Sequence, residues 1–156
     1  MPLTPGTRLG PYEITAPLGA GGMGEVYKAR DTRLDRIVAI KTSKQQFSER
    51  FEREARAVAA LNHPNICTLH DVGHQDGIDF LVMEYLEGET LDEILQRRKR
   101  LPPAEAVRLV YQTLVGLQHI HEQGMVHRDL KPANLMVIPA GVRGPNDTTL
   151  KSNIKV

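Results

Sequence analysis

Three polar side chains in the segment 126–135, Asp129, Lys131 and Asn134, could carry out chemistry together. Asp129 and Asn134 are five positions apart with Pro132 between them, so that one loop can bring both to the same place. A carboxylate can accept or orient the proton of a hydroxyl group, and an amide oxygen can bind Mg²⁺. A nearby lysine can neutralise charge on a phosphoryl group during its transfer. The segment therefore favours phosphoryl-transfer chemistry over the alternative, a capped polar loop with internal ion pairs.

A lysine on an apolar strand and an acid on a helix form a second candidate pair. Lys41 follows three apolar residues, and burying its ammonium group is costly unless an anion meets it. Glu54 shares one helical face with Phe51 and Val58, where a lone carboxylate would also be costly. We therefore expect Glu54 to hold Lys41 toward a phosphate. A structural ion pair, or a lysine that reaches solvent along its apolar stem, remains the alternative.

The segment 19–26 has the glycine pattern G-x-G-x-x-G-x-V. Glycines let the backbone approach a phosphate and direct N–H groups toward it. A Walker loop would need Lys followed by Ser or Thr after the last glycine, where Glu25 and Val26 stand. A dinucleotide-binding fold would need a helix next, but residues 25–29 alternate like a strand. A glycine-rich hairpin over nucleotide phosphates fits best, with an ordinary glycine hairpin as the alternative.

The composition places these motifs in a soluble globular protein. Of the 156 residues, 40% are hydrophobic and 25% are charged, which argues against disordered, collagenous and membrane classes. The net charge of +1 gives no reason to expect nucleic acid or an anionic membrane as a partner. Cys67 is the single cysteine, so a disulfide-stapled secreted domain is excluded. With neither a signal peptide nor a long apolar run at hand, we expect a cytoplasmic location.

The elements that must position these residues change in character along the chain. The first part predicts strands at residues 12–18, 25–30, 37–42, 67–72 and 78–85, and a helix at 48–61 with Ser48 as its N-cap. The second part predicts helices at 91–98 and 103–124, a short strand at 135–138, a loop at 139–152, and the beginning of a strand at 153–156.

Read in order, these motifs resemble those of the eukaryotic-like Ser/Thr protein kinases, most closely the bacterial members. The matching segments are GAGGMGEV, VAIK, the acid in REA, LNHPNI, VMEY and HRDLKPAN, and they span essentially the whole chain. The resemblance implies an α+β kinase fold. An antiparallel five-stranded small lobe with one helix, the glycine-rich loop and the hinge would occupy residues 1–86. The first part of a mainly helical large lobe would occupy residues 87–156.

The resemblance also implies a catalytic role for each matching residue. Asp129 would be the catalytic base toward the substrate hydroxyl, and Lys131 would contact the γ-phosphate. Lys41, paired with Glu54, would bind the α- and β-phosphates of ATP. Asn134 would hold a Mg²⁺ ion. The implied activity is the ATP-dependent phosphorylation of a protein Ser or Thr.

An ATP pocket follows from the same resemblance. The backbone of Glu84 and Leu86 would hydrogen-bond the adenine, Met83 would control the back of the pocket, and Met136 would form its floor. The glycine-rich hairpin and the apolar residues over the adenine would complete the pocket, together with Lys41 and Asn134. These residues are Leu18, Gly19, Ala20, Gly21, Gly22, Met23, Gly24, Val26 and Ala39.

The residues next to Asp129 in the sequence indicate the class of substrate. Lys131 stands two places after the acid, which resembles Ser/Thr kinases rather than tyrosine kinases. Arg128 together with Lys131 favours protein substrates, and Arg128 suggests activation by phosphorylation. The partners implied are ATP and a protein substrate, with no nucleic acid and no membrane contact within this chain.

The sequence ends where the family continues into Asp-Phe-Gly, whose Asp is the principal Mg²⁺ ligand. We therefore expect this chain by itself to transfer phosphate weakly or not at all, and to expose apolar surface on the helix at 103–124. The main alternative is a non-catalytic nucleotide-binding or regulatory kinase fragment. Nucleic-acid binding through the basic run 97–100 is disfavoured, because no aromatic residues interleave with it.

Overall fold

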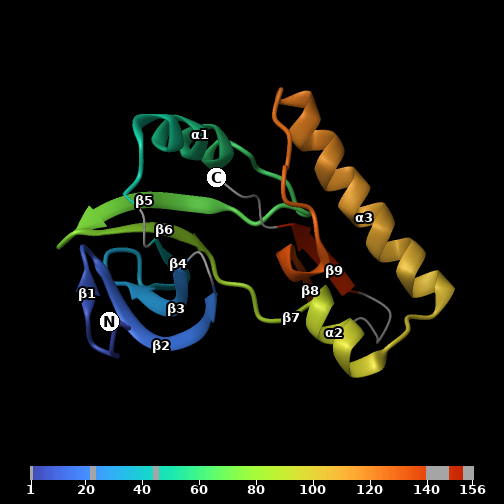
Figure 1. Ribbon diagram of the computed structural model, residues 1–156, viewed down its shortest axis with the longest axis horizontal. Coiled ribbons are helices and arrows are strands. Elements are labelled where there is room, and N and C mark those ends of the chain that lie inside the picture. Colours follow the sequence, from blue (N-terminus) through green and yellow to red (C-terminus); the bar gives the residue numbers. More distant parts are fainter. Residues whose placement is uncertain (1, 22–23, 44–45, 140–147, 153–156) are drawn as a thin grey trace. The chain divides into compact units, whose positions relative to one another are not determined.

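The computed structural model describes residues 2–21, 24–43, 46–139 and 148–152 (Figure 1). The described chain forms two compact units. The first contains the residues up to 60 together with 68–85, and the second contains 61–67 together with the residues from 86 onward. The first is an antiparallel sheet with one helix, and the second combines helices with a small sheet, which confirms the α+β class. The assignment of residues 1–86 and 87–156 to two kinase lobes remains a prediction.

In the described part of the chain, the sheet of the first unit has six strands, where five were predicted. Its order is β1 (Arg8–Leu9), β2 (Tyr12–Gly21), β3 (Gly24–Asp31), β4 (Arg36–Ser43), β6 (Ile78–Glu84) and β5 (Leu69–Gln75), with every neighbouring pair antiparallel. The additional strand, β1, is two residues long and pairs with the start of β2. Two residues are too few to show an alternating pattern, so no strand could be predicted there.

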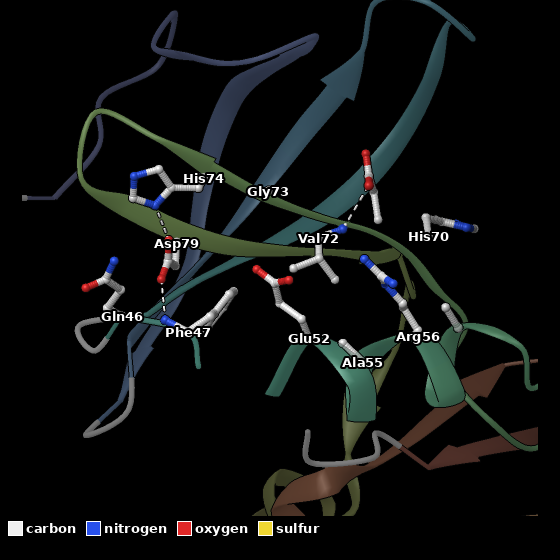
Figure 2. A pocket seen from close by; sticks show the side chains of 12 residues that line it. Gln46, Phe47, Glu52, Ala55, Arg56, His70, Val72, Gly73, His74 and Asp79 are labelled. Atoms are coloured by element: carbon white, nitrogen blue, oxygen red, sulfur yellow. Dashed lines mark hydrogen bonds and ion pairs between the residues drawn. The ribbon is translucent and has the colours of Figure 1, made fainter. Parts of the chain in front are cut away.

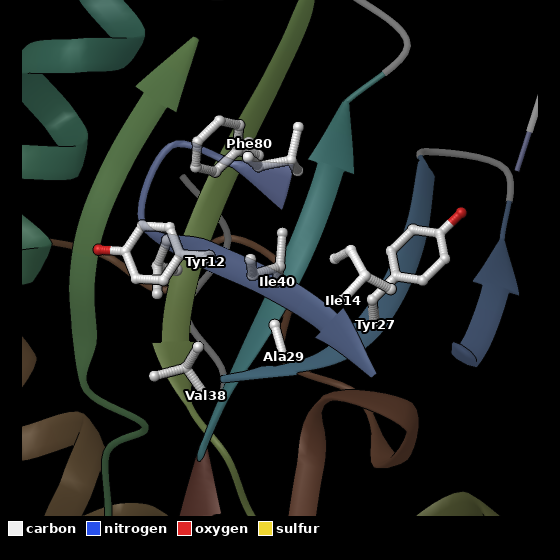
Figure 3. Close-up of a cluster of buried hydrophobic side chains, with 9 residues drawn as sticks. Tyr12, Ile14, Tyr27, Ala29, Val38, Ile40 and Phe80 are labelled. Carbon is white, nitrogen blue, oxygen red and sulfur yellow. The ribbon is translucent and has the colours of Figure 1, made fainter. Parts of the chain in front are cut away.

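One face of this sheet carries the core of the first unit. Side chains alternate between the two faces of a strand, so every second residue of β3 and β4 points into this core. Figure 3 shows the cluster, in which Tyr12, Tyr27 and Phe80 are the aromatic members beside smaller aliphatic ones. The buried members are Leu9, Tyr12, Ile14, Tyr27, Ala29, Val38, Ile40, Phe80 and Val82. The opposite face of β3 and β4 is thereby left for other contacts.

Helix α1 (Glu49–Ala59) packs on β5 within the first unit. Ser48 is its N-cap, as predicted, since its Oγ accepts a hydrogen bond of 3.2 Å from the Phe51 N–H. Strand β5 begins at Leu69, so the predicted start at residue 67 is wrong. The preceding residues belong to the second unit, where Asn65 Nδ2 donates to the Leu150 carbonyl at 2.8 Å. This hydrogen bond ties the segment to β9 (Thr148–Ser152) of the second unit.

The second unit contains a sheet in the order β7 (Glu89–Thr90), β8 (Leu135–Pro139) and β9 (Thr148–Ser152), with helices α2 (Leu91–Arg98) and α3 (Pro103–Glu122). A loop was predicted throughout 139–152, which is wrong for β9. Leu150 is completely buried and pairs with Val137 of β8, and this burial makes the segment a strand. The strand predicted at 153–156 lies outside the described residues. The core consists of Ile94, Leu109, Leu135, Val137 and Leu150.

Helix α3 has one buried and one exposed apolar face. Leu109 and Ile120 are buried, whereas four large side chains are 57–68% exposed, namely Val107, Val110, Tyr111 and Leu114. The exposed apolar surface predicted for this helix is therefore present. Within the described part of the chain, no helix combines the length and the apolar character that crossing a membrane requires.

Candidate functional site

The loop after α3 brings together the three polar residues predicted from its sequence. Asn134 Nδ2 donates one hydrogen bond to Asp129 Oδ2 at 2.9 Å and another to the Asp129 carbonyl at 2.8 Å. Lys131 Nζ lies 3.7 Å from Asp129 Oδ1. The two oxygens of the carboxylate thus contact different groups, the ammonium of Lys131 at Oδ1 and the amide of Asn134 at Oδ2. A carboxylate held in this way is oriented rather than freely rotating.

Backbone contacts within the same loop maintain this arrangement. The His127 side chain is buried, and its Nδ1 accepts a hydrogen bond of 3.3 Å from the Asp129 N–H. Arg128, between them, adopts a left-handed conformation with φ of 65°, which is uncommon for a residue with a side chain. A single 3₁₀ turn, η1 (Pro132–Asn134), follows and leads into the buried start of β8. The local backbone conformation of this loop therefore determines the position of Asp129.

The oxygen donors of this loop suit a hard cation. Both hydrogen bonds from Asn134 to Asp129 are donated by Nδ2. The amide oxygen of Asn134, Oδ1, takes no part in them and can serve as a metal ligand. Amide and carboxylate oxygens are the ligands that Mg²⁺ prefers. The part of the chain that the structure describes contains no cluster of three or more His, Cys, Asp or Glu side chains that could hold a metal by themselves.

The first unit places the predicted nucleotide-binding residues of its strands on one sheet face. Gly19 pairs with Val26, and Val26 pairs with Lys41, across three neighbouring strands. Ala39, two residues before Lys41, pairs with Met83 on the next strand. Directly opposed residues of antiparallel strands have their side chains on the same face. Four strands thus contribute to one continuous surface, which lies on the side of the sheet opposite the core described above.

The glycine hairpin between β2 and β3 has one position that only glycine can occupy. Gly24 has φ of 144°, and a Cβ atom there would lie 1.8 Å from the Thr42 carbonyl oxygen. A Cβ at Gly19 would meet no atom within 4 Å. The close approach of Gly24 to β4 brings the hairpin against the strand that carries Lys41. Of the other predicted hairpin residues, Gly22 and Met23 lie outside the described residues.

The predicted pair of Lys41 and Glu54 stays a prediction. Lys41 is half-buried on β4. Glu54 is half-buried on α1, and its Oε1 accepts from Arg50 Nε at 2.9 Å, one helical turn earlier. Both residues belong to the first unit, on adjacent elements of the chain.

The segment predicted to bind adenine begins at the end of β6. The Glu84 N–H donates to the Thr68 carbonyl at 2.9 Å, and Glu84 Oε2 accepts from the Thr68 N–H at 3.3 Å. These two contacts anchor the backbone at Glu84. Leu86, also predicted to contact adenine, belongs to the second unit, as does Met136 on β8.

Sequence reasoning missed a cavity of about 510 Å³ between α1 and β5. Figure 2 shows its lining, in which Glu52 and Arg56 of α1 lie across from residues of β5. None of the described residues that line it belongs to the predicted set. Because the lining comes from three separate segments of the chain, no single motif could indicate it. Burial lowers the pKa of His70, which lies at one end of this cavity, and the charge of Arg36 acts in the same direction.

Comparisons with known proteins identify the family of the chain. The family model of the protein kinase domain matches residues 12–145. The serine/threonine-protein kinase PrkC of Bacillus subtilis is 42% identical over 134 residues, which cover 82% of this chain and 21% of that protein. The serine/threonine-protein kinase PknA of Mycobacterium tuberculosis is 42% identical over 146 residues, which cover 86% of this chain and 34% of that protein.

Solved structures support the same assignment. The crystal structure of the PknI kinase domain of Mycobacterium tuberculosis matches with a TM-score of 0.84 at 28% sequence identity, covering 98% of this chain and 62% of that one. The chain thus spans between a fifth and a third of the two curated relatives named above. Members of the family use ATP and a metal ion. On the match of the family model and the identity to these relatives, the chain belongs to the protein kinase family.

Proposed function

We propose that this chain contributes the ATP-binding surface and the catalytic loop of a protein kinase that phosphorylates Ser or Thr. The observation that carries the proposal is the Asp129 carboxylate held between Lys131 and Asn134. Phosphoryl transfer needs little covalent chemistry from the protein, so that positioning and charge stabilisation are its main tasks. A fixed carboxylate next to an ammonium group and an amide oxygen meets both needs.

Each residue of the loop has a separate task in the proposed reaction. Asp129 orients the substrate hydroxyl and accepts its proton. Lys131, whose side chain is 56% exposed, can move toward the γ-phosphate and neutralise its charge. Asn134 would hold Mg²⁺ through Oδ1, and Lys41 would bind the α- and β-phosphates. When bound, Mg²⁺ neutralises charge on the phosphate oxygens.

A protein hydroxyl is the substrate class that we propose. Arg128 and Lys131 are both exposed, so they offer two cations next to the proposed base. Arg128 also has the planar guanidinium group that suits a phosphorylated side chain, which supports activation by phosphorylation. A cytoplasmic location, where ATP is available, belongs to the same proposal.

ATP binding by the chain tests the first half of the proposal. Titration calorimetry with Mg²⁺ and ATP should show saturable binding, and Lys41→Met should weaken it about tenfold or more, because a charge-assisted contact to phosphate is lost. Arg30→Met is the matched control. It removes one positive charge from the same sheet, at an exposed residue that pairs with Asp35 at 2.7 Å. Equal affinities of the two variants would contradict the proposal.

A further inference from the structure

Asp79 is a buried acid to which the proposed reaction assigns no role. It lies on β6 with only 4% of its surface exposed, at one end of the cavity between α1 and β5. Its Oδ2 accepts a hydrogen bond from the Phe47 N–H, and its Oδ1 contacts His74 Nδ1 (Figure 2). Both carboxylate oxygens are therefore engaged, one by the chain that leads into α1 and one by β5.

The hydrogen bond to Phe47 is placed at the entry of α1. Phe47 precedes the N-cap residue Ser48, and its ring stacks on that of Phe51 with a centroid distance of 3.9 Å. An apolar residue before the N-cap that packs on the first turn sets the angle at which the chain enters a helix. Asp79, Ser48 and the ring pair thus act on the same turn. Glu54 follows three residues after Phe51, so its position depends on how this turn is held.

Asp79 also has a fixed place relative to the strand of Lys41. It pairs in register with Ser43, the last residue of β4, two positions after Lys41. On its other side it pairs with His74 of β5. Asp79 therefore pairs through its backbone with the end of the strand that carries Lys41, while its side chain binds the segment that leads into the helix carrying Glu54.

The carboxylate is held in its charged form. Burial by itself would raise the pKa of Asp79, but the hydrogen bonds from His74 and the Phe47 N–H, together with the charge of His74, outweigh burial and lower it. A hydrogen bond from a backbone N–H to an ionised acceptor is stronger than one between neutral groups. The contact with Phe47 therefore persists at neutral pH.

We propose that Asp79 is a positioning residue for ATP binding, which fixes the start of α1 and, through it, the place of Glu54 relative to Lys41. This inference rests on the proposed function, because it assumes that Glu54 assists Lys41 in binding phosphate. Asp79 does not touch the nucleotide in this proposal.

A double-mutant cycle tests whether Asp79 acts through Glu54. In the full chain, Asp79→Asn should weaken the binding of Mg²⁺ and ATP about tenfold, because the charge that accepts from Phe47 is lost. In a Glu54→Gln background the same change should weaken binding by less than about twofold, because the group that Asp79 positions is already neutral. Equal losses in both backgrounds would overturn the proposal, since a merely structural role gives additive effects.

Hydrogen exchange without nucleotide tests the positioning itself. In Asp79→Asn, the amides of residues 49–54 should exchange faster, while those of β3 and β4 keep their protection. Asp76→Asn is the matched control, an exposed acid in the turn between β5 and β6 whose φ of 53° suits asparagine, and it should change neither segment. Unchanged exchange in α1, or equal loss of protection throughout the sheet, would overturn the proposal. If the unaltered chain binds no ATP, the proposed function fails, and exchange still decides whether Asp79 fixes α1.

Discussion

The loop at 127–134 and the sheet face around Lys41 are built in opposite ways. In the loop, the contacts that hold Asp129 join residues two to five positions apart, such as His127 with Asp129 and Asp129 with Asn134. On the sheet face, Gly19, Val26 and Lys41 are separated by seven and fifteen positions and meet only through strand register. The first region is assembled by local backbone conformation, and the second by the pairing of strands.

This difference predicts which substitutions affect function alone and which affect stability. A change in the local loop removes a chemical group and leaves distant packing intact. A change on the sheet face alters how neighbouring strands approach, and therefore the free energy of unfolding of the whole first unit. The predictions below test this contrast, beginning with the largest expected effect.

The largest effect is expected from Asp129→Asn in the loop. Any transfer of phosphate to a Ser-containing peptide, by this chain or by a longer protein that includes it, should fall about 10²–10⁴-fold, because the proton acceptor is lost. The free energy of unfolding should stay the same, since asparagine has nearly the same shape and an oxygen acceptor. Radiolabelled phosphate transfer and urea unfolding measure the two quantities. Full transfer by this variant would show that the loop is not catalytic.

On the sheet face, Gly24→Ala should destabilise the first unit by about 2–4 kcal/mol, because the new Cβ meets the Thr42 carbonyl and the backbone conformation disfavours a side chain. Gly19→Ala, in the same hairpin, should cost less than about 1 kcal/mol, because its Cβ would enter open space. Urea unfolding of both variants gives the comparison. Similar losses of stability in the two variants would mean that the close approach of Gly24 to β4 does not exclude a side chain at this position of the hairpin.

The turn at Asp31 combines the two kinds of construction, since its contacts are local but its carboxylate is completely buried under the sheet. Its Oδ1 accepts from the Arg33 N–H at 3.0 Å and from the Leu34 N–H at 3.4 Å. Burial by itself would raise the pKa of Asp31. Those hydrogen bonds and the charges of Arg33 and Arg36 outweigh burial and lower it.

A lowered pKa means that ionised Asp31 stabilises the folded state above the pKa of an unfolded aspartate, about 3.9. This stabilisation is lost as the pH falls from there through the lower pKa of the folded state. Asp31→Asn should reduce the free energy of unfolding at pH 7 by about 1–3 kcal/mol and flatten its decline in acid. Urea unfolding between pH 7 and pH 2 measures both effects. Asp35→Asn, at an exposed side chain in the same turn, serves as the control. If the two variants showed the same dependence of unfolding free energy on pH, the prediction would be contradicted.

The smallest effect is expected at the start of α2, a local contact in the second unit. Thr90 Oγ1 accepts from the Glu93 N–H at 3.1 Å, and Glu93 Oε2 accepts from the Thr90 N–H at 2.8 Å. Thr90→Ala should lower the free energy of unfolding by about 1 kcal/mol, because the first turn of α2 loses its cap. Glu93→Gln should change it by less than about 0.5 kcal/mol, since glutamine can replace glutamate in a capping box. Thermal unfolding that ranks these variants in the reverse order would exclude the capping role.

Much of the local structure could be predicted from the sequence. Helix α2 has the predicted bounds, Leu91–Arg98, and α3 begins at the predicted Pro103, because capping residues and prolines act within a few positions. The strands β2, β3, β4 and β6 lie within a few residues of their predicted places. By contrast, β1, β7 and β9 were missed, since two-residue strands and a strand defined by the burial of Leu150 have no period to detect.

The order and spacing of its motifs determined on their own that this chain belongs to the protein kinase family. They also determined that Asp129, Lys131 and Asn134 share a loop, because those contacts span at most five positions. Only the tertiary structure decided that residues 61–67 join the second unit, that residues of α1 and β5 line a cavity, and that Asp79 reaches Phe47. These features depend on pairs of residues far apart in the sequence. Which distant partner a buried polar group meets is settled by packing, and packing has no local pattern.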